Sequence, residues 1–178
     1  MKALVIVDVQ NDFMPTGTLP VPQGDQIIPF INVEMTQGYD LIVATQDWHP
    51  ATHKSFASQH KGKKPFDVVQ LNGIDQILWP DHCVQGTFGA QLHKDLDIRP
   101  ISAIFRKGMN SKIDSYSAFF DNNKLNNTGL HGFLQDKGIT ELVFCGLAGD
   151  FCVAYSANDA KVLGYKVSLF DKGIRSIN

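Results

Sequence analysis

Five short apolar runs are spread along the chain, and each has the length of one buried strand. They are ALVIV at 3–7, LIVAT at 41–45, ISAIF at 101–105, ELVFC at 141–145 and KVSLF at 166–170. Helix-like segments lie at 25–38, where apolar residues recur at helical spacing, and at 150–164, which Gly164 is expected to end. Continuous apolar strands between helices are typical of a mainly parallel sheet covered on both faces. The pattern therefore predicts a three-layer α/β/α fold.

The segment 46–100 shows no such periodicity and is rich in His, Gly and Pro. A loop of that length in a compact domain either carries function or contains short elements that the pattern does not reveal. The chain has no internal repeat, low-complexity tract or obvious linker. We therefore expect residues 1–178 to form a single domain.

Composition adds few constraints on partners. The chain is 43% hydrophobic and 19% charged, with a formal net charge of −2, so neither nucleic acid nor an anionic membrane is expected as a partner. The N-terminal apolar run is too short for a signal peptide, and no window approaches the ~18 apolar residues of a membrane span. The odd set of cysteines, Cys83, Cys145 and Cys152, indicates reduced thiols and a cytoplasmic location.

Polar side chains that can take part in catalysis or metal binding follow four of the apolar runs. Asp8 follows the first run, Asp47 the second, Lys107 the third, and Cys152 comes shortly after the fourth. In an open parallel sheet, ligands bind beyond the carboxyl ends of the strands. An acid, a metal-type carboxylate, a lysine and a thiol at one edge are hard to explain by core packing alone.

Cys152 can be a buried apolar side chain, the usual fate of a free cysteine, or a nucleophile. Its predicted place in the first turn of a helix would stabilise an anion and lower the pKa of the thiol. Gly146 and Gly149 would let the backbone come close to a substrate. Asp8 is either a turn cap or the base for this thiol, and Lys107 is either a solvated lysine or the cation beside both groups.

The segment TQDWHPATHKSF at 45–56 carries a second kind of chemistry. Asp47 and His49 are two residues apart, so their side chains point the same way in extended chain. His82, in WPDHC, offers a third ligand, and His53 is either a fourth ligand or an ordinary histidine. A carboxylate with imidazoles suits a divalent transition metal such as zinc, iron or manganese.

The sequence resembles the nicotinamidases of the isochorismatase-like cysteine hydrolase superfamily. The matching stretches are ALVIVDVQNDF at 3–13, ATQDWHPATHKSFA at 44–57, LWPDHCVQGTFGA at 78–90, FRKGMNSKIDSYSAF at 105–119 and GLAGDFCVAYSANDA at 146–160. They cover nearly the whole chain in the order of the family. The resemblance implies the isochorismatase-like hydrolase fold and an amidohydrolase that converts nicotinamide to nicotinic acid and ammonia.

The resemblance also implies roles for individual residues. Asp8, Lys107 and Cys152 would form a catalytic triad, with Cys152 forming a thioester and Asp8 acting as acid and base. A cis peptide before Ala148 would turn its N–H toward the oxyanion beside the N–H of Cys152. Asp47, His49 and His82 would hold one metal ion, most simply zinc, that binds the pyridine nitrogen.

Aromatic residues would complete the pocket. Phe13 and Trp79 match positions that sandwich the pyridine ring, and Tyr116 would cover it. Phe151 stands where some members of the family have histidine, and its role is open. The family continues past the last strand with a further helix, so the C-terminal layer is expected either to be shortened or to come from elsewhere. A homo-oligomer is one of the expected assemblies.

Other functions fit parts of this pattern. A metal-independent amidase of the same superfamily, acting on N-carbamoyl or ureido compounds, or a vinyl-ether hydrolase would need the triad without the metal ligands. A purely metal-dependent hydrolase would need the metal ligands without Cys152. A binding domain that has lost activity would need neither.

Overall fold

The computed structural model describes residues 1–178 and contains a five-stranded parallel sheet in the order β5-β2-β1-β6-β7. The strands are β1 (Lys2–Val7), β2 (Leu41–Asp47), β5 (Ala103–Lys107), β6 (Glu141–Gly146) and β7 (Lys166–Ile174). A separate antiparallel hairpin is formed by β3 (Val68–Leu71) and β4 (Ile74–Ile77). The predicted α/β class with a mainly parallel sheet is therefore confirmed.

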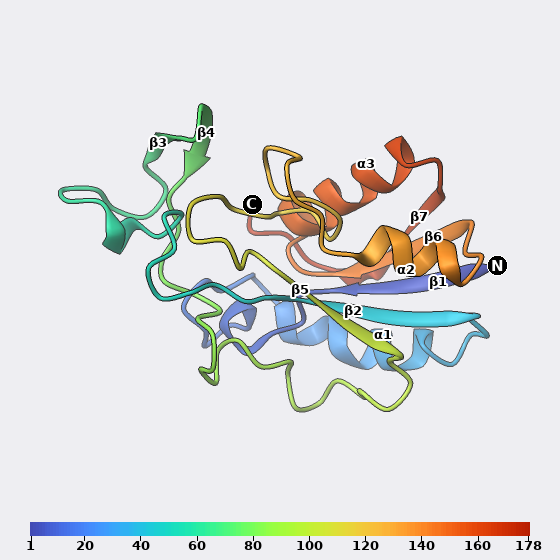
Figure 1. The fold of residues 1–178 in the computed structure, drawn as a ribbon. Coiled ribbons are helices and arrows are strands. Elements are labelled where there is room, and N and C mark those ends of the chain that lie inside the picture. The colour runs from blue at the N-terminus through green and yellow to red at the C-terminus, as the bar shows by residue number, and fades with distance from the viewer.

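Helices cover both faces of the sheet (Figure 1). Helix α1 (Ile28–Glu34) lies on one face, and α2 (Leu130–Asp136) and α3 (Ala154–Val162) lie on the other. The central strand β1 alternates between these layers. Leu4 and Ile6 belong to the core under α1, while Val5 and Val7 belong to the core under α2 and α3. Burial on both faces explains why β1 is a continuous apolar run.

The site loops all leave the sheet at the end opposite the N-terminus (Figure 1). Because β1, β2, β5 and β6 are parallel, Asp8, Asp47, Lys107 and the turn after Gly146 meet at this edge. The last register pair of β2 and β5 joins Asp47 to Lys107 directly. The sheet itself therefore brings together the polar residues that follow the apolar runs.

Two features depart from the sequence prediction. The helix expected over 150–164 begins instead as a π-helical turn, Gly149–Val153, and continues as α3 up to Val162, with Gly164 at a φ of +92° just beyond it. The hairpin β3–β4 and the short helix α2 were not predicted. The hairpin lies within the segment 46–100, which therefore contains short elements of its own.

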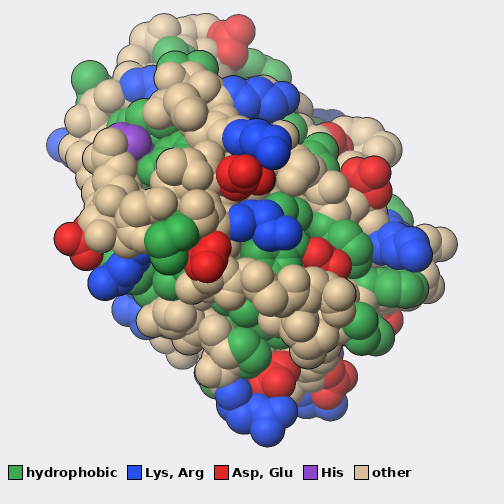
Figure 2. Space-filling view, turned by 90° about the vertical axis from the view of Figure 1, so that its right-hand side faces the viewer, with side chains coloured by type: hydrophobic (Ala, Val, Ile, Leu, Met, Phe, Trp, Pro, Cys, Tyr) green, Lys and Arg blue, Asp and Glu red, His purple; other side chains and the backbone are tan.

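Charged side chains of both signs are interspersed on the face at the N-terminal end of the sheet (Figure 2). No single-sign field covers this face, which agrees with the small net charge of −2. None of the helices has the length and apolar character needed to cross a membrane.

Candidate active site

The Cys152 thiol lies just beyond the carboxyl end of β6, in the π-helical turn that leads into α3. Its side chain is buried, with 7% of the residue exposed. The turn leaves the sheet at Gly146, where a Cβ atom would lie 2.0 Å from the carbonyl oxygen of Val7. Only glycine permits this close approach of β1 and β6. π-helical turns are frequent at functional sites.

Lys107 is the residue that connects the polar groups of this edge. Its ammonium Nζ lies 2.8 Å from Asp8 Oδ2, 2.5 Å from Asp47 Oδ1 and 3.4 Å from Cys152 Sγ. It also donates a hydrogen bond to the carbonyl oxygen of Ser115, at 3.0 Å. Burial alone would lower the pKa of Lys107, but the Asp47 and Asp8 carboxylates raise it well above its ordinary value. The lysine therefore remains a cation.

Asp8 is held by β2 as well as by Lys107. The Thr45 hydroxyl donates a hydrogen bond to Asp8 Oδ1 at 2.6 Å and accepts one from the Asp8 backbone N–H at 3.2 Å. The backbone at Asp8 has a φ of +48°, in the left-handed region, so the chain turns sharply where β1 ends. Asp8, Asp47 and Cys152 each place a side-chain atom within 4.8 Å of the others. The predicted triad is thus brought together.

The pKa values of the acid and the thiol both rise in this environment. Burial raises the pKa of Cys152 well above its ordinary value, and the Asp8 and Asp47 carboxylates add to this, while Lys107 opposes it. The expected lowering by the helix terminus is therefore wrong in this resting arrangement. Burial likewise raises the pKa of Asp8, against the effect of Lys107. A carboxylate with a raised pKa is a better acceptor for a thiol proton.

The residues predicted to bind a metal form a second buried cluster. Asp47 Oδ2 lies 3.7 Å from His49 Nε2 and 3.9 Å from His82 Nε2. The Nδ1 atoms of His49 and His82 are hydrogen-bonded to the carbonyl oxygens of Gly108 and Pro80, at 2.9 and 2.8 Å. Backbone carbonyls on Nδ1 leave the Nε2 lone pairs free for a metal.

The donor set fits a divalent transition metal. The ligand atoms of Asp47, His49 and His82 all lie within 4.8 Å of one another, and all three residues are buried. Lys107 and the neighbouring histidines lower the pKa of Asp47 despite the opposing effect of burial, so this carboxylate is ionised. One carboxylate and two imidazoles with open positions are typical of zinc and of related ions.

Gln10 fixes the backbone that carries Asp47. Its side-chain amide accepts a hydrogen bond from the Asp47 N–H and donates one to the Asp47 carbonyl, both at 2.8 Å. The same amide nitrogen also donates to the carbonyl of Ala90. Because β1 has already turned away at Asp8, the Gln10 side chain continues the hydrogen bonding of the sheet beyond the end of that strand. Sequence patterns gave no signal for this role.

His53 lies beside the metal-type cluster but outside its closest group. Its ring is 4.4 Å from the His49 ring, and its Nδ1 is hydrogen-bonded to the Ser55 hydroxyl at 2.7 Å. Its Nε2 is buried and has no hydrogen-bond partner in the protein. His53 also groups with His49 and Asp114, with one ligand atom of each residue within 4.8 Å of the others. His53 as a fourth ligand therefore stays a prediction.

A narrow cavity of about 20 Å³ connects the thiol with the metal-type cluster. Its wall contains the predicted pocket residues Phe13, Trp79 and Tyr116, together with Ala148 and Cys152. The other lining residues are Leu19, Asp47, His82, Asp114, Phe151 and Ile177. All three predicted aromatic side chains therefore face one space with the nucleophile candidate and two of the metal-type residues.

Phe151 belongs to this aromatic wall. Its ring meets Trp79 edge to face, with centroids 4.9 Å apart and an interplanar angle of 89°, and it meets Tyr116 at 5.7 Å. Asp114 also lines the cavity and is buried, although nothing in SKIDSYS distinguished it from an ordinary loop residue. These two residues are the main additions that the fold makes to the predicted site.

The turn before Cys152 has the backbone form that the resemblance implies. The peptide between Leu147 and Ala148 is cis. The N–H of Ala148 donates to no protein group, and Ala148 lines the cavity. The Ala148 carbonyl accepts hydrogen bonds from Phe151 and Val153, which close the π-helical turn. A backbone donor without a protein partner therefore belongs to a residue that lines the cavity beside the thiol.

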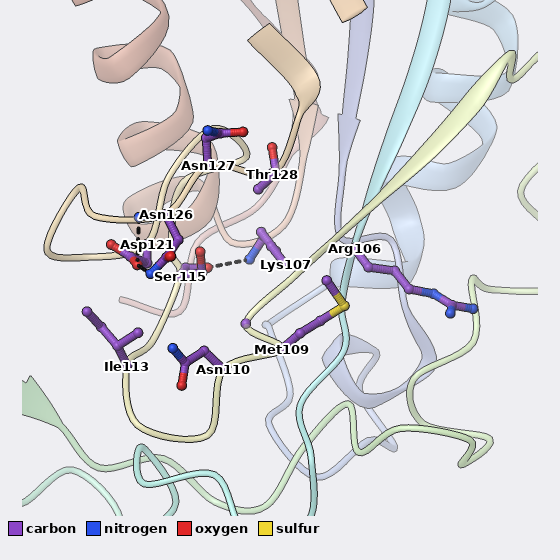
Figure 3. Close-up of a pocket in the computed structure, with 11 residues that line it drawn as sticks. Arg106, Lys107, Met109, Asn110, Ile113, Ser115, Asp121, Asn126, Asn127 and Thr128 are labelled. Carbon is purple, nitrogen blue, oxygen red and sulfur yellow. Dashed lines mark hydrogen bonds between the residues drawn. The ribbon is translucent and has the colours of Figure 1, made fainter. Parts of the chain in front are cut away.

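A larger, polar cavity of about 270 Å³ lies on another side of Lys107 (Figure 3). It is lined by Lys107 and Ser115, whose hydrogen bond the figure shows, and by polar residues such as Asn110, Asn126 and Thr128. Asp8 and Cys152 do not line it. The substrate is therefore expected in the smaller aromatic cavity, where the reactive groups meet.

Comparison with known proteins identifies the family of the chain. The sequence model of the isochorismatase domain family matches residues 2–178 of this chain. The chain belongs to the isochorismatase family. Within this family it is 48% identical to a nicotinamidase from Escherichia coli over 180 residues, which is 99% of this chain and 84% of the relative.

Solved structures of family members have the same fold. A nicotinamidase and pyrazinamidase from Acinetobacter baumanii superposes with a TM-score of 0.97 at 46% identity, over 99% of this chain and 85% of that one. A pyrazinamidase from Pyrococcus horikoshii, solved in complex with zinc, gives a TM-score of 0.79 at 36% identity, over 99% and 87%. The isochorismatase-like fold is therefore established for this chain.

Proposed function

We propose that this chain is a nicotinamidase, which hydrolyses nicotinamide to nicotinic acid and ammonia through a thioester on Cys152. The observation that carries the proposal is the lining of one cavity by the Cys152 thiol, by Asp47 and His82 of the metal-type cluster, and by aromatic rings. The relatives named nicotinamidase support the same substrate. The enzyme class is an amidohydrolase acting on a linear amide.

Binding orients the pyridine ring between Phe13 and Trp79, with Tyr116 over its edge. Bound by Asp47, His49 and His82, a divalent transition metal would supply a Lewis-acid contact for the ring nitrogen. Zinc is the ion that the Pyrococcus horikoshii structure supports. The cavity of about 20 Å³ must widen to admit the ring, and its mostly buried walls then limit the access of water. The carboxamide is then held against the thiol, which raises its effective concentration.

Acylation begins with transfer of the Cys152 proton to Asp8. The Lys107 ammonium, 3.4 Å from Sγ and 2.8 Å from Asp8 Oδ2, stabilises the thiolate as it forms. The thiolate attacks the carboxamide carbon, and the oxyanion is bound by the N–H groups of Ala148 and Cys152. Each such donor contributes about 3 kcal/mol in comparable sites. Asp8 returns the proton to the amide nitrogen, so the C–N bond breaks and ammonia leaves.

Deacylation uses the same groups in reverse order. A water molecule gives a proton to Asp8 and attacks the thioester carbon, forming a second oxyanion at the same donors. The C–S bond then breaks, nicotinic acid leaves, and Asp8 returns the proton to the Cys152 sulfur. The double use of Asp8 follows from microscopic reversibility. A nucleophilic thiol must be reduced, which fits the cytoplasmic location that the sequence predicts.

The thioester provides the most direct test. Purified protein is mixed with nicotinamide, quenched rapidly in acid and analysed by mass spectrometry, while ammonia and nicotinic acid are measured in parallel. We expect equal amounts of both products and a nicotinoyl adduct on the peptide that contains Cys152 but not on Cys83 or Cys145. Release of ammonia from N-carbamoyl compounds alone, without need of a metal, would instead support the amidase alternative.

A further inference from the structure

The hairpin β3–β4 projects from the body of the molecule, yet one of its side chains is buried (Figure 1). Gln76, on β4, is 1% exposed. Its neighbour Asp75 is exposed, and so is Gln70, which pairs with Asp75 across the hairpin. The amide of Gln76 therefore points from an exposed hairpin into the protein. No step proposed above uses it.

Gln76 contacts the outer wall of the aromatic cavity. Its side-chain nitrogen lies 3.0 Å from the Tyr116 hydroxyl, 3.2 Å from Asp114 Oδ2 and 2.7 Å from the carbonyl of Ile77. Tyr116 and Asp114 both line the cavity, whereas Gln76 does not. Any effect of Gln76 on a bound substrate must therefore pass through its neighbours.

The Tyr116 hydroxyl is the centre of this contact. It accepts a second hydrogen bond from the Trp79 indole Nε1, at 3.1 Å. Indole and amide N–H groups only donate, so the two donors fix the hydroxyl oxygen between them. Trp79 and Tyr116 are also the rings on which Phe151 packs. The hydrogen bonds thus fix the relative positions of two cavity walls.

Buried polar groups make this arrangement sensitive to loss of the amide. Without the Gln76 amide, the Asp114 carboxylate would accept a hydrogen bond only from the Ser115 N–H. The Tyr116 hydroxyl would accept one only from the Trp79 indole. The loss of a hydrogen-bond partner is costly where a polar group is shielded from solvent, as Asp114 is fully and Tyr116 is partly. We therefore expect Tyr116 to change position when the amide is lost.

We propose that Gln76 is a positioning residue that couples the β3–β4 hairpin to the substrate cavity through Tyr116. This inference rests on the proposed function only for the identity of the substrate. The aromatic wall contacts the ring and not the reacting carboxamide, so it binds ground state and transition state alike. Loss of such uniform binding raises KM and leaves kcat nearly unchanged.

Kinetics of Gln76→Leu and Gln76→Glu test this effect. We expect KM for nicotinamide to rise about tenfold in Gln76→Leu, and further in Gln76→Glu, where a carboxylate would face Asp114, with kcat within about twofold. Gln70→Leu is the matched control on the exposed side of the same hairpin and should leave both constants unchanged. Equal losses of kcat in the two Gln76 variants, without a change in KM, would overturn the proposal.

A double-mutant cycle with Tyr116→Phe separates positioning from general destabilisation. If Gln76 acts through the Tyr116 hydroxyl, the double variant should have nearly the same KM as Tyr116→Phe alone. Additive increases in KM would mean that Gln76 acts elsewhere. If Gln76→Leu acted only by weakening the hairpin, Gln70→Leu, which removes the Gln70–Asp75 hydrogen bond within the hairpin, should give the same change.

Fluorescence tests the contact without turnover. In a Trp48→Phe background, Trp79 is the only tryptophan, since the chain contains two. Gln76→Leu should shift its emission to longer wavelength, and Gln70→Leu should not. An unshifted emission in Gln76→Leu would refute the coupling. If the wild-type protein released no ammonia from nicotinamide, the proposed function would fail, while this measurement would still decide the role of Gln76.

Discussion

Cys145 and Cys152 lie at the end of β6 and in the turn that follows it, and both thiols are buried. Burial raises the pKa of each. They differ in their neighbours: Cys145 Sγ lies 3.9 Å from the Val5 carbonyl in the core, whereas Cys152 lies 3.4 Å from the Lys107 ammonium. Burial therefore does not distinguish the two thiols from each other. A nearby cation and a base make the chemical difference.

The largest expected effect separates the two thiols directly. Cys152→Ala should lower nicotinamide turnover by at least about 10⁴-fold, because the covalent route is lost. Cys145→Ala should keep activity within about twofold and cost about 1–2 kcal/mol of stability as a small core cavity. Ammonia release and urea unfolding measure these outcomes. Near-normal turnover by Cys152→Ala would favour a hydrolase that depends only on a metal.

The second largest effect concerns Lys107, the cation that lies beside Cys152 and not beside Cys145. Lys107→Met should lower kcat about 10³-fold and destabilise the fold by about 3 kcal/mol, because the Asp8 and Asp47 carboxylates remain buried without a cation. Lys124→Met removes a partly exposed pair with Asp159 and should cost less than about 1 kcal/mol. Thermal unfolding and steady-state kinetics compare the two variants. Equal losses of stability in the two variants would show that burial of the Lys107 ion pairs adds nothing to their contribution.

Removing the metal should separate substrate orientation from the thiol. Dialysis against a chelator should lower kcat/KM for nicotinamide at least about 100-fold, and added zinc should restore it. Cys152 should still react with iodoacetamide in the chelated protein, because Lys107 and Asp8 are held by other contacts. Full activity after verified metal loss would contradict the proposed role of Asp47, His49 and His82.

A smaller effect concerns stability and pH. Burial, together with the charge of His49, lowers the pKa of His53 to about 4. Between this value and the ordinary pKa of histidine, near 6.5, the unfolded chain binds more protons than the folded one. Stability from this group is therefore present at pH 7 and lost as pH falls, by about 2 kcal/mol at pH 5.

Urea unfolding of metal-free protein at both pH values measures this difference. His53→Asn should be less sensitive to the change from pH 7 to pH 5 by about the same 2 kcal/mol. An unchanged pH dependence in the variant would assign the effect to another group.

The sequence predicted the parts of the molecule that obey simple periodicity. Strands buried on both faces, such as β1, are continuous apolar runs, and the reactive residues follow them at the edge where ligands bind. The hairpin β3–β4 was missed although Asn72 and Gly73 form its turn, with φ values of +52° and +82°. Asn-Gly between alternating residues is a strong hairpin signal.

Other site residues had no signal in the sequence. Gln10, Gln76 and Asp114 act through hydrogen bonds to residues far away in the chain, and each looks like an ordinary polar residue in its own segment. Phe151 could be located but not interpreted, because its role depends on the rings of Trp79 and Tyr116. Such roles depend on tertiary contacts that periodicity and spacing do not encode.

The register of β2 and β5 has a consequence for redesign. Asp47 and Lys107 are partners in the last rung of this ladder, so the distance between the catalytic ammonium and the metal-type cluster is set by the spacing of neighbouring strands. Changes in loop length can reshape the cavity for other aromatic rings without altering that distance. A one-residue shift within either strand would point one of the two side chains to the opposite face and separate the ammonium from the Asp47 carboxylate.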